Sequence, residues 1–233
     1  MSDKLSIPLS IVVAGLLIGG GFYLRGSSKN NYNPIKEGIE QSAGMRPVDA
    51  SDHVLGNPEA RLILVEYSDP ECPFCKNFHS TMRQLMSEYG QGGSLSWVYR
   101  HFPLAQLHPN APRLAEASEC VAELAGEDAF WSFLDEVFAL APVNTLFPMD
   151  RLTDTAVKVG ANRTAFESCL NSGRYQSVVE AEFNDAIASG GQGTPHNIIL
   201  AAGQVIPVPG AQPYNQMKTI IEAILAETGS EIN

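Results

Sequence analysis

Residues 61–75 have the sequence RLILVEYSDPECPFC, which places a short apolar run, a turn and two cysteines in immediate succession. The run 61–67 is rich in branched side chains and is followed by a turn composition, so it predicts a buried β-strand. From Phe74 onward, apolar side chains recur at spacings of three and four residues, which predicts an amphipathic helix ended by Gly90. The members of this stripe are Phe74, Phe78, Met82, Leu85 and Tyr89.

The two cysteines fall at the predicted junction between strand and helix. Cys72 takes the position before the first helical residue, and Pro73 suits that first position because proline has no N–H to lose there. A sulfur at a helix N-terminus faces unpaired N–H groups and the positive end of the helix dipole, which favour the thiolate. Cys75, one turn further along, is placed to attack a mixed disulfide on Cys72. The pair is therefore predicted to be redox-active.

Other uses of a C-x-x-C sequence fit this chain less well. A zinc site would need a second cysteine or histidine pair at suitable spacing, and a haem attachment would need histidine where the chain has Lys76. A disulfide across two residues closes too short a loop to add much stability. No metal site and no cofactor are predicted. His79 is either a metal ligand beside the thiols or a polar residue on the helix flank, and the second interpretation is preferred.

The N-terminus carries an uncharged run, residues 5–24, that is long enough for a helix to cross a bilayer core. It follows a short tip, residues 1–4, and it is either an uncleaved transmembrane anchor, which is preferred, or a cleaved signal peptide. Residues 25–50 are rich in Ser, Asn and Gly and are predicted to be a tether. Either interpretation places the following domain outside the cytoplasm. Positive charge after the run argues the other way, but long domains cross membranes largely regardless of such charge.

The composition excludes some classes of protein. A net charge of −11 argues against a general nucleic-acid binder, which needs a basic face for the phosphates. Four cysteines in 233 residues are too few for a small disulfide scaffold, and the apolar share of 44% is too high for a disordered chain.

The remaining sequence predicts an α/β fold. Residues 95–101 alternate like a strand, and helical spacing interrupted by proline and glycine follows over about ninety residues. Residues 197–201 and 204–208 predict a hairpin about Ala202 and Gly203, and residues 211–227 predict a closing helix before a tail, 228–233.

Several motifs in order resemble the DsbA-like branch of the thioredoxin superfamily, in particular its small, membrane-tethered bacterial members. The motifs are VEYSDPECPFC (65–75), YRHFPL (99–104), HPNAPRLAEASECVAE (108–123), DAFWSFLDEVFA (128–139), FESCLNSGRY (166–175) and GTPHNII (193–199). The resemblance implies a thioredoxin fold over residues 51–227, with a helical insert at about 106–188.

The resemblance also implies roles for individual residues. Glu66, six residues before Cys72, matches an acidic group buried behind the thiols, where it exchanges a proton with Cys75. A solvent-facing glutamate is the alternative, but the strand is apolar on both faces, which favours burial. Thr194 and Pro195 match the cis-proline loop that pairs with an extended substrate, and Pro73 and Phe74 are expected on the same surface.

Two features depart from the family pattern. Asp69 and Glu71 lie close to Cys72, where nearby carboxylates would disfavour the thiolate, so a milder oxidant is hypothesised. A fall of two units or more in the pKa of Cys72 would refute this hypothesis. His196 follows the cis-proline position and has no assigned role.

Cys120 and Cys169 both fall on predicted helices of the insert. They are either buried free thiols or a structural disulfide, and an oxidising compartment favours the disulfide.

The predicted function is an enzyme that introduces disulfides into exported thiol-containing proteins. The expected location is the cell membrane, with a single span and the catalytic domain on the extracytoplasmic side. A quinone-linked membrane partner is expected to reoxidise the enzyme. Two alternatives stay open: a reductase or isomerase with the same chemistry reversed, and a binding module, either a holdase or a metal carrier using Cys72, Cys75 and His79.

Overall fold

A computed structural model describes residues 44–141 and 146–230 of the 233-residue chain. Its centre is a five-stranded sheet with the strand order β1-β3-β2-β4-β5. The central strand β2 pairs in parallel with β3, whereas the other neighbours are antiparallel. The strands are β1 (His53–Gly56), β2 (Leu62–Ser68), β3 (Leu95–His101), β4 (His196–Ala201) and β5 (Gln204–Pro209).

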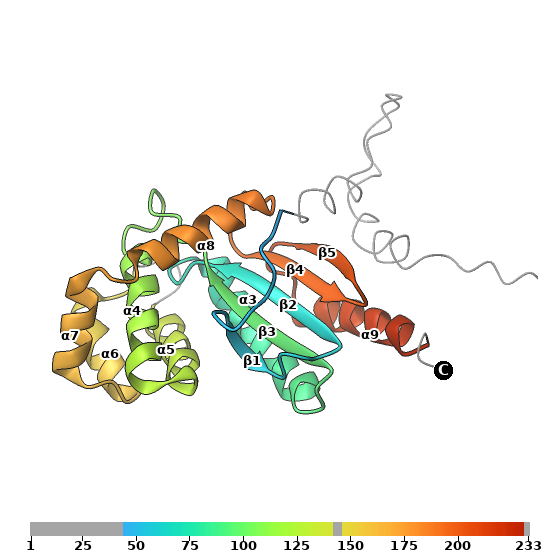
Figure 1. Ribbon diagram of the computed structural model, residues 1–233, viewed down its shortest axis with the longest axis horizontal. Helices are drawn as coiled ribbons and strands as arrows, with labels where there is room; N and C mark the ends of the chain where they lie inside the picture. The colour runs from blue at the N-terminus through green and yellow to red at the C-terminus, as the bar shows by residue number, and fades with distance from the viewer. Residues whose placement is uncertain (1–43, 142–145, 231–233) are drawn as a thin grey trace, which may run out of the picture.

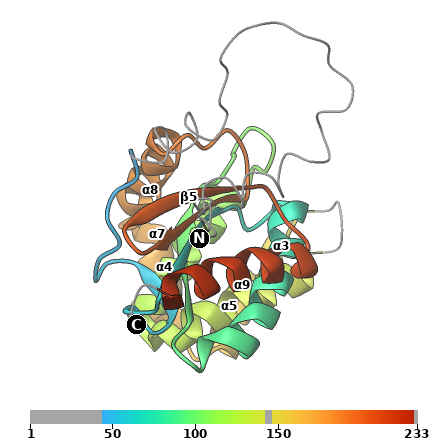
Figure 2. The same cartoon turned by 90° about the vertical axis from the view of Figure 1, so that its right-hand side faces the viewer.

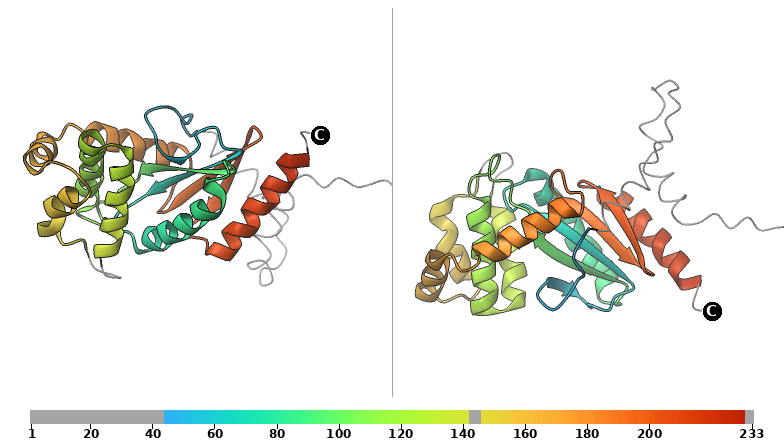
Figure 3. Two further views of the ribbon diagram at one scale, coloured as in Figure 1. Left: turned by 90° about the horizontal axis from the view of Figure 1, so that it is seen from below. Right: turned by 45° about the horizontal axis from the view of Figure 1, so that its top comes forward.

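Helices cover both faces of this sheet (Figures 1 and 3). Helix α3 (Pro73–Leu85), which continues into the wide turn η1 (Met86–Gly90), packs beside α9 (Tyr214–Ser230) on one face (Figure 2). Helix α8 (Gln176–Ala188) crosses the other face. The strand, helix and hairpin predicted around the cysteines and at 197–208 are confirmed.

The alternation of side chains along β2 determines the face of the sheet on which Glu66 lies. Leu62 and Leu64 join the core beneath α3 and α9, whereas Val65 and Tyr67 join the core beneath α8. Successive strand side chains point to opposite faces, so Glu66 lies on the same side as α3, the helix that carries the cysteines.

The helical insert has a core of its own. After β3 the chain forms helices that pack mainly on one another at one end of the sheet (Figure 1). They are α4 (Ala111–Ala125), α5 (Glu127–Leu140), the 3₁₀ turn η2 (Met149–Arg151), α6 (Leu152–Lys158) and α7 (Arg163–Ser172). Cys120 of α4 and Cys169 of α7 form a disulfide within this core, as the sequence analysis favoured.

Two helix boundaries and one strand differ from the prediction. Helix α9 begins at Tyr214 rather than at residue 211, because the residue before Pro213 is pushed out of the helical region. The same helix continues to Ser230, so the predicted tail begins inside it. Strand β1 was not predicted, since four residues at a sheet edge carry too little alternation to stand out.

The predicted anchor, residues 5–24, lies outside the described residues. The end of the predicted tether is described, and it is held on the domain. The Arg46 backbone N–H donates to Asp185 Oδ1 at 2.7 Å, and its guanidinium donates to Asp52 Oδ1 at 2.6 Å. Contacts of this kind with residues far along the chain are not visible in local composition, which is why residues 44–50 looked like a tether. Within 44–141 and 146–230, no helix combines the length and apolar character that a membrane span requires.

Candidate active site

The two redox-pair cysteines lie at the N-terminus of α3, as the sequence predicts. Cys72 is the N-cap residue in an extended conformation, and Pro73 occupies the first helical position. The Lys76 N–H donates to the Cys72 carbonyl at 3.0 Å, which closes the first turn. The turn brings the Cys75 sulfur to Asp69, the residue that follows β2. Both cysteines are free thiols, and Cys75 is completely buried.

Their environments separate the acidities of the two thiols. The pKa of Cys72 falls to about 6, because the Cys75 thiol, the Thr194 side chain and the backbone N–H groups of Cys75 and Phe74 stabilise its thiolate against the cost of burial. Burial, followed by the charge of Cys72, raises the pKa of Cys75 well above its usual value. At neutral pH Cys72 is therefore the nucleophile and Cys75 holds a proton.

Glu66 lies behind the thiols and is fully buried, as the sequence analysis favoured. Its carboxylate accepts hydrogen bonds from the Ser68 hydroxyl at 2.7 Å and from the Trp97 indole N–H at 3.0 Å. Burial raises its pKa to about 8, although these two hydrogen bonds oppose the shift. A carboxyl group with a pKa near neutrality can give and take protons under physiological conditions.

The buried end of β2 links this carboxyl group to Cys75. The Asp69 backbone N–H donates to the Cys75 sulfur at 3.4 Å, and Ser68, the residue before it, bonds to Glu66. Ser68 and Trp97 were missed by the sequence analysis. A period-two count from Glu66 would have placed Ser68 on the same face of the strand, but nothing in the sequence pairs Trp97 with Glu66.

The loop before β4 reaches Cys72 from the distant part of the chain. The Thr194–Pro195 peptide bond is cis, and Cys72 Sγ donates to the Thr194 carbonyl at 3.5 Å. Phe74, between the cysteines, exposes 64% of its surface. The structure therefore brings Thr194 and Cys72 together and leaves an aromatic ring open to solvent beside Pro73.

The hypothesis of a milder oxidant is wrong by its own criterion, since the pKa of Cys72 falls by more than two units. Both carboxylates are buried and accept hydrogen bonds from groups other than the thiol. Asp69 accepts from the Leu104 N–H and pairs with His108, each at 2.8 Å. Glu71 accepts from the N–H groups of Asn110 and Phe147. These donors balance the two charges, so the thiolate is not opposed.

The two histidines that the sequence analysis left without a firm role, His79 and His196, pack against aromatic rings. His79 is buried against Trp97 and Phe138, and its Nε2 lies 2.6 Å from Asp135 Oδ1. His196 stacks on Tyr67. Among the described residues, the metal-ligating atoms of Cys72, Cys75 and His79 do not form a cluster close enough to hold one ion. This geometry argues against the metal carrier that the sequence left open.

Comparison with protein families gives a match to the family described as Thioredoxin over residues 49–223. Among curated proteins, the Na(+)/H(+) antiporter NhaA 3 of Salinispora tropica is 36% identical over 152 residues, which are 65% of this chain and 22% of the antiporter. The antiporter NhaA 1 of Mycolicibacterium gilvum is 44% identical over 95 residues, which are 40% of this chain and 15% of that protein. The chain thus spans less than a quarter of the length of these relatives.

Solved structures show the same fold. The alpha-DsbA1 protein of Wolbachia pipientis superposes with a TM-score of 0.69 and 20% identity, covering 83% of this chain and 100% of its own. Oxidised BdbD from Bacillus subtilis gives a TM-score of 0.68 at 22% identity, covering 78% of this chain and 97% of its own. With the family match over residues 49–223, the chain belongs to the thioredoxin family, and its fold is like that of the DsbA proteins.

Proposed function

We propose that this protein introduces disulfides into exported proteins by passing on the Cys72–Cys75 disulfide. The observation that carries the proposal is the position of Cys72 at the N-cap of α3, with the buried thiol of Cys75 one turn along, a setting that lowers the pKa of Cys72 to about 6. A stabilised thiolate stabilises the reduced enzyme, and an enzyme with a stable reduced form is a strong oxidant.

The exchange runs in two steps. A substrate thiolate attacks the Cys72 sulfur of the enzyme disulfide, and Cys75 leaves with the electron pair of the broken bond. A second substrate thiolate then attacks the substrate sulfur of the mixed disulfide, and Cys72 leaves as a thiolate. The substrate gains a disulfide and the enzyme becomes the dithiol. Because Cys72 has the lower pKa, it is the better leaving group in the second step.

Glu66 supplies the proton in the first step. The leaving Cys75 sulfur is buried, and burial raises its pKa well above the usual value, so it needs a proton as the bond breaks. Glu66 lies on the face of β2 that packs against α3, the helix of the cysteines. Its pKa of about 8 keeps it protonated at neutral pH, so the proton is available. Ser68, bonded to Glu66 and adjacent to the Asp69 N–H that contacts Cys75, positions the carboxyl group.

The substrate binds as an extended segment across the cis-proline loop. The backbone of Thr194 lies against Cys72, and strand-like pairing there brings a substrate cysteine to the reactive sulfur. The exposed ring of Phe74 and the neighbouring Pro73 provide an apolar contact for the residues beside that cysteine. Pro195 removes an N–H that would otherwise compete for this pairing.

We further propose that the protein works on the extracytoplasmic side of the cell membrane, held by residues 5–24. The Cys120–Cys169 disulfide supports an oxidising compartment, because such bonds rarely persist in the cytosol. A quinone-linked membrane protein would then take the electrons from the reduced thiols. Ion exchange is not proposed, because the similarity covers only 22% of the length of the Salinispora tropica antiporter.

The reduction potential of the Cys72–Cys75 pair tests the direction of the reaction. The purified protein is equilibrated in glutathione buffers, and the fraction of dithiol is measured by alkylation and mass spectrometry. A potential above about −180 mV is expected for an oxidant of exported thiols. A potential near about −270 mV, the level of thioredoxin, would overturn the proposal in favour of a reductase.

A further inference from the structure

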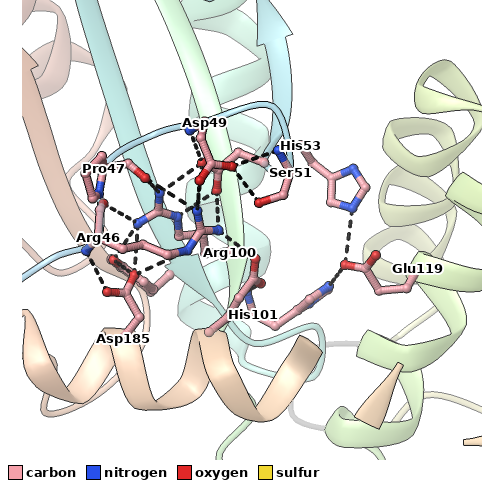
Figure 4. Close-up of polar contacts among 12 residues, drawn as sticks. Arg46, Pro47, Asp49, Ser51, His53, Arg100, His101, Glu119 and Asp185 are labelled. Carbon is pink, nitrogen blue, oxygen red and sulfur yellow. Dashed lines mark hydrogen bonds and ion pairs between the residues drawn. The ribbon is translucent and has the colours of Figure 1, made fainter. Parts of the chain in front are cut away.

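A buried group of histidine and glutamate side chains lies where the sheet meets the helical insert (Figure 4). His53 comes from β1 and His101 from the end of β3, whereas Glu119 comes from α4 and Glu182 from α8. All four residues are buried. We propose that these four side chains bind a divalent transition-metal ion, with zinc as the ion their chemistry fits best.

The spacing of the polar atoms suits such an ion. His53 Nε2 and His101 Nε2 lie 3.2 and 3.0 Å from the same oxygen, Glu119 Oε1. The ligand atoms of His101, Glu119 and Glu182 lie within 4.8 Å of one another. Zinc bonds to nitrogen and oxygen are about 2.0–2.2 Å, so neighbouring ligand atoms of a tetrahedral site are about 3.3 Å apart. Glu182 already lies within this set, whereas His53 Nε2 is near Glu119 alone, so a shift of the His53 side chain toward the other three would complete a four-ligand site.

An outer contact of the kind found at zinc sites is already present. The second nitrogen of His53, Nδ1, lies 2.8 Å from Glu127 Oε2. Metal-bound histidines commonly donate the other ring N–H to a carboxylate, which fixes the ring and makes the ligating nitrogen more basic. Without an ion, His53 Nε2 donates its proton to Glu119, and a bound ion would take the place of that proton while Nδ1–H stays on Glu127.

Hydrogen bonds within the described residues leave some donor and acceptor sites of these side chains unused. His101 is completely buried, and its Nδ1 has no hydrogen-bond partner among residues 44–141 and 146–230. Glu182 accepts from Arg46 at 3.3 Å and from the His101 backbone N–H at 2.6 Å, one on each oxygen. A carboxylate offers about four lone-pair sites, so either oxygen can still coordinate an ion.

The donor set selects the kind of ion. Two imidazole nitrogens with two carboxylates suit zinc and its neighbours, whereas calcium and magnesium prefer oxygen ligands alone. The two carboxylate charges also neutralise a divalent ion, which a buried site requires. An ion bound at this site would link strands β1 and β3 to helices α4 and α8. It would thereby stabilise the packing of the insert on the sheet.

Zinc binding to the oxidised full-length protein tests this proposal, because the Cys72–Cys75 disulfide removes thiolates that would also bind zinc. After chelator treatment, the protein is titrated with ZnCl₂ by calorimetry and with CoCl₂ by visible absorption. The expected result is one equivalent of each ion, with cobalt d–d bands and no thiolate charge-transfer band. Zinc is also expected to raise the thermal unfolding midpoint.

Matched variants locate the site. Glu119→Gln is expected to abolish binding, whereas Glu116→Gln on the same helix retains it. Glu127→Gln leaves all four ligands in place and is expected to weaken zinc binding about 10- to 100-fold. Glu127→Gln also keeps the test decisive if Glu119→Gln fails to fold. Circular dichroism of each variant in the presence of chelator would reveal such a failure. Absence of stoichiometric binding by the oxidised protein, or wild-type affinity in both Glu119→Gln and Glu127→Gln, would overturn the proposal.

Discussion

The buried carboxyl group of Glu66 gives this protein a predictable dependence of stability on pH. Its pKa rises from an ordinary 4.5 to about 8, chiefly because burial opposes the charged form. Between these two values the folded protein holds a proton that the unfolded chain has lost. The unfolded state therefore binds fewer protons, and the free energy of unfolding falls as the pH rises.

The size of this effect follows from the shift. Each pKa unit corresponds to about 1.36 kcal/mol, so the rise of the Glu66 pKa from 4.5 to about 8 makes its full ionisation cost about 5 kcal/mol. Between about pH 5 and about pH 8 the cost grows by about 3 to 4 kcal/mol. Glu66→Gln removes the titrating group. Over this pH range the free energy of unfolding of the variant should therefore fall by about 3 to 4 kcal/mol less than that of the wild type.

Urea unfolding of the oxidised protein at a series of pH values measures the difference. The oxidised form is used because the lowered pKa of Cys72 in the dithiol contributes a slope of the opposite sign between about pH 6 and about pH 9. Glu180→Gln, a change at an exposed glutamate, should follow the wild type. If the free energy of unfolding changed in parallel with pH for wild type and Glu66→Gln, the conclusion that Glu66 is buried and protonated would be refuted.

Three further outcomes are expected. Ultraviolet titration of the thiolate should give a midpoint near about pH 6 for Cys72, and Thr194→Val should raise that midpoint because it removes a group that stabilises the thiolate. Glu71→Gln should lower the free energy of unfolding by about 2 kcal/mol, since it leaves N–H donors without a charged acceptor, yet keep the Cys72 midpoint within about half a unit. A larger change in that midpoint would restore the hypothesis of a milder oxidant. Replacing Cys120 and Cys169 together by serine should cost about 4 kcal/mol in urea unfolding, given their separation of 49 residues; a loss below about 1 kcal/mol would contradict it.

The redox turn could be predicted from the sequence because its chemistry is local. The strand before Cys72, the proline after it and the helical stripe beyond it each follow from neighbouring residues. The burial of Glu66 also followed from its own strand, which is apolar on both faces. Resemblance supplied the positions of Thr194 and Pro195, which local patterns alone would not have joined to the thiols.

Tertiary structure decided which charges act on the thiols. By sequence, Asp69 and Glu71 lie within three residues of Cys72, so their charges were expected to oppose the thiolate. In the fold, donors from distant loops satisfy both carboxylates, and the loop that carries Thr194, 122 residues away in sequence, lies against Cys72. Electrostatic energy depends on distance, burial and hydrogen bonding in space, and separation along the chain does not report these.

The same reason explains the histidine and glutamate group at the base of the insert. His53, His101, Glu119 and Glu182 lie on four different elements, and no spacing between them resembles a ligand motif. The sequence by itself determined the strand, the helix and the reactive cysteine pair, because short-range sterics and hydrogen bonding fix them. Only the packing of α4 and α8 against the sheet brings these four side chains together, since long-range contacts depend on how whole elements bury their apolar faces.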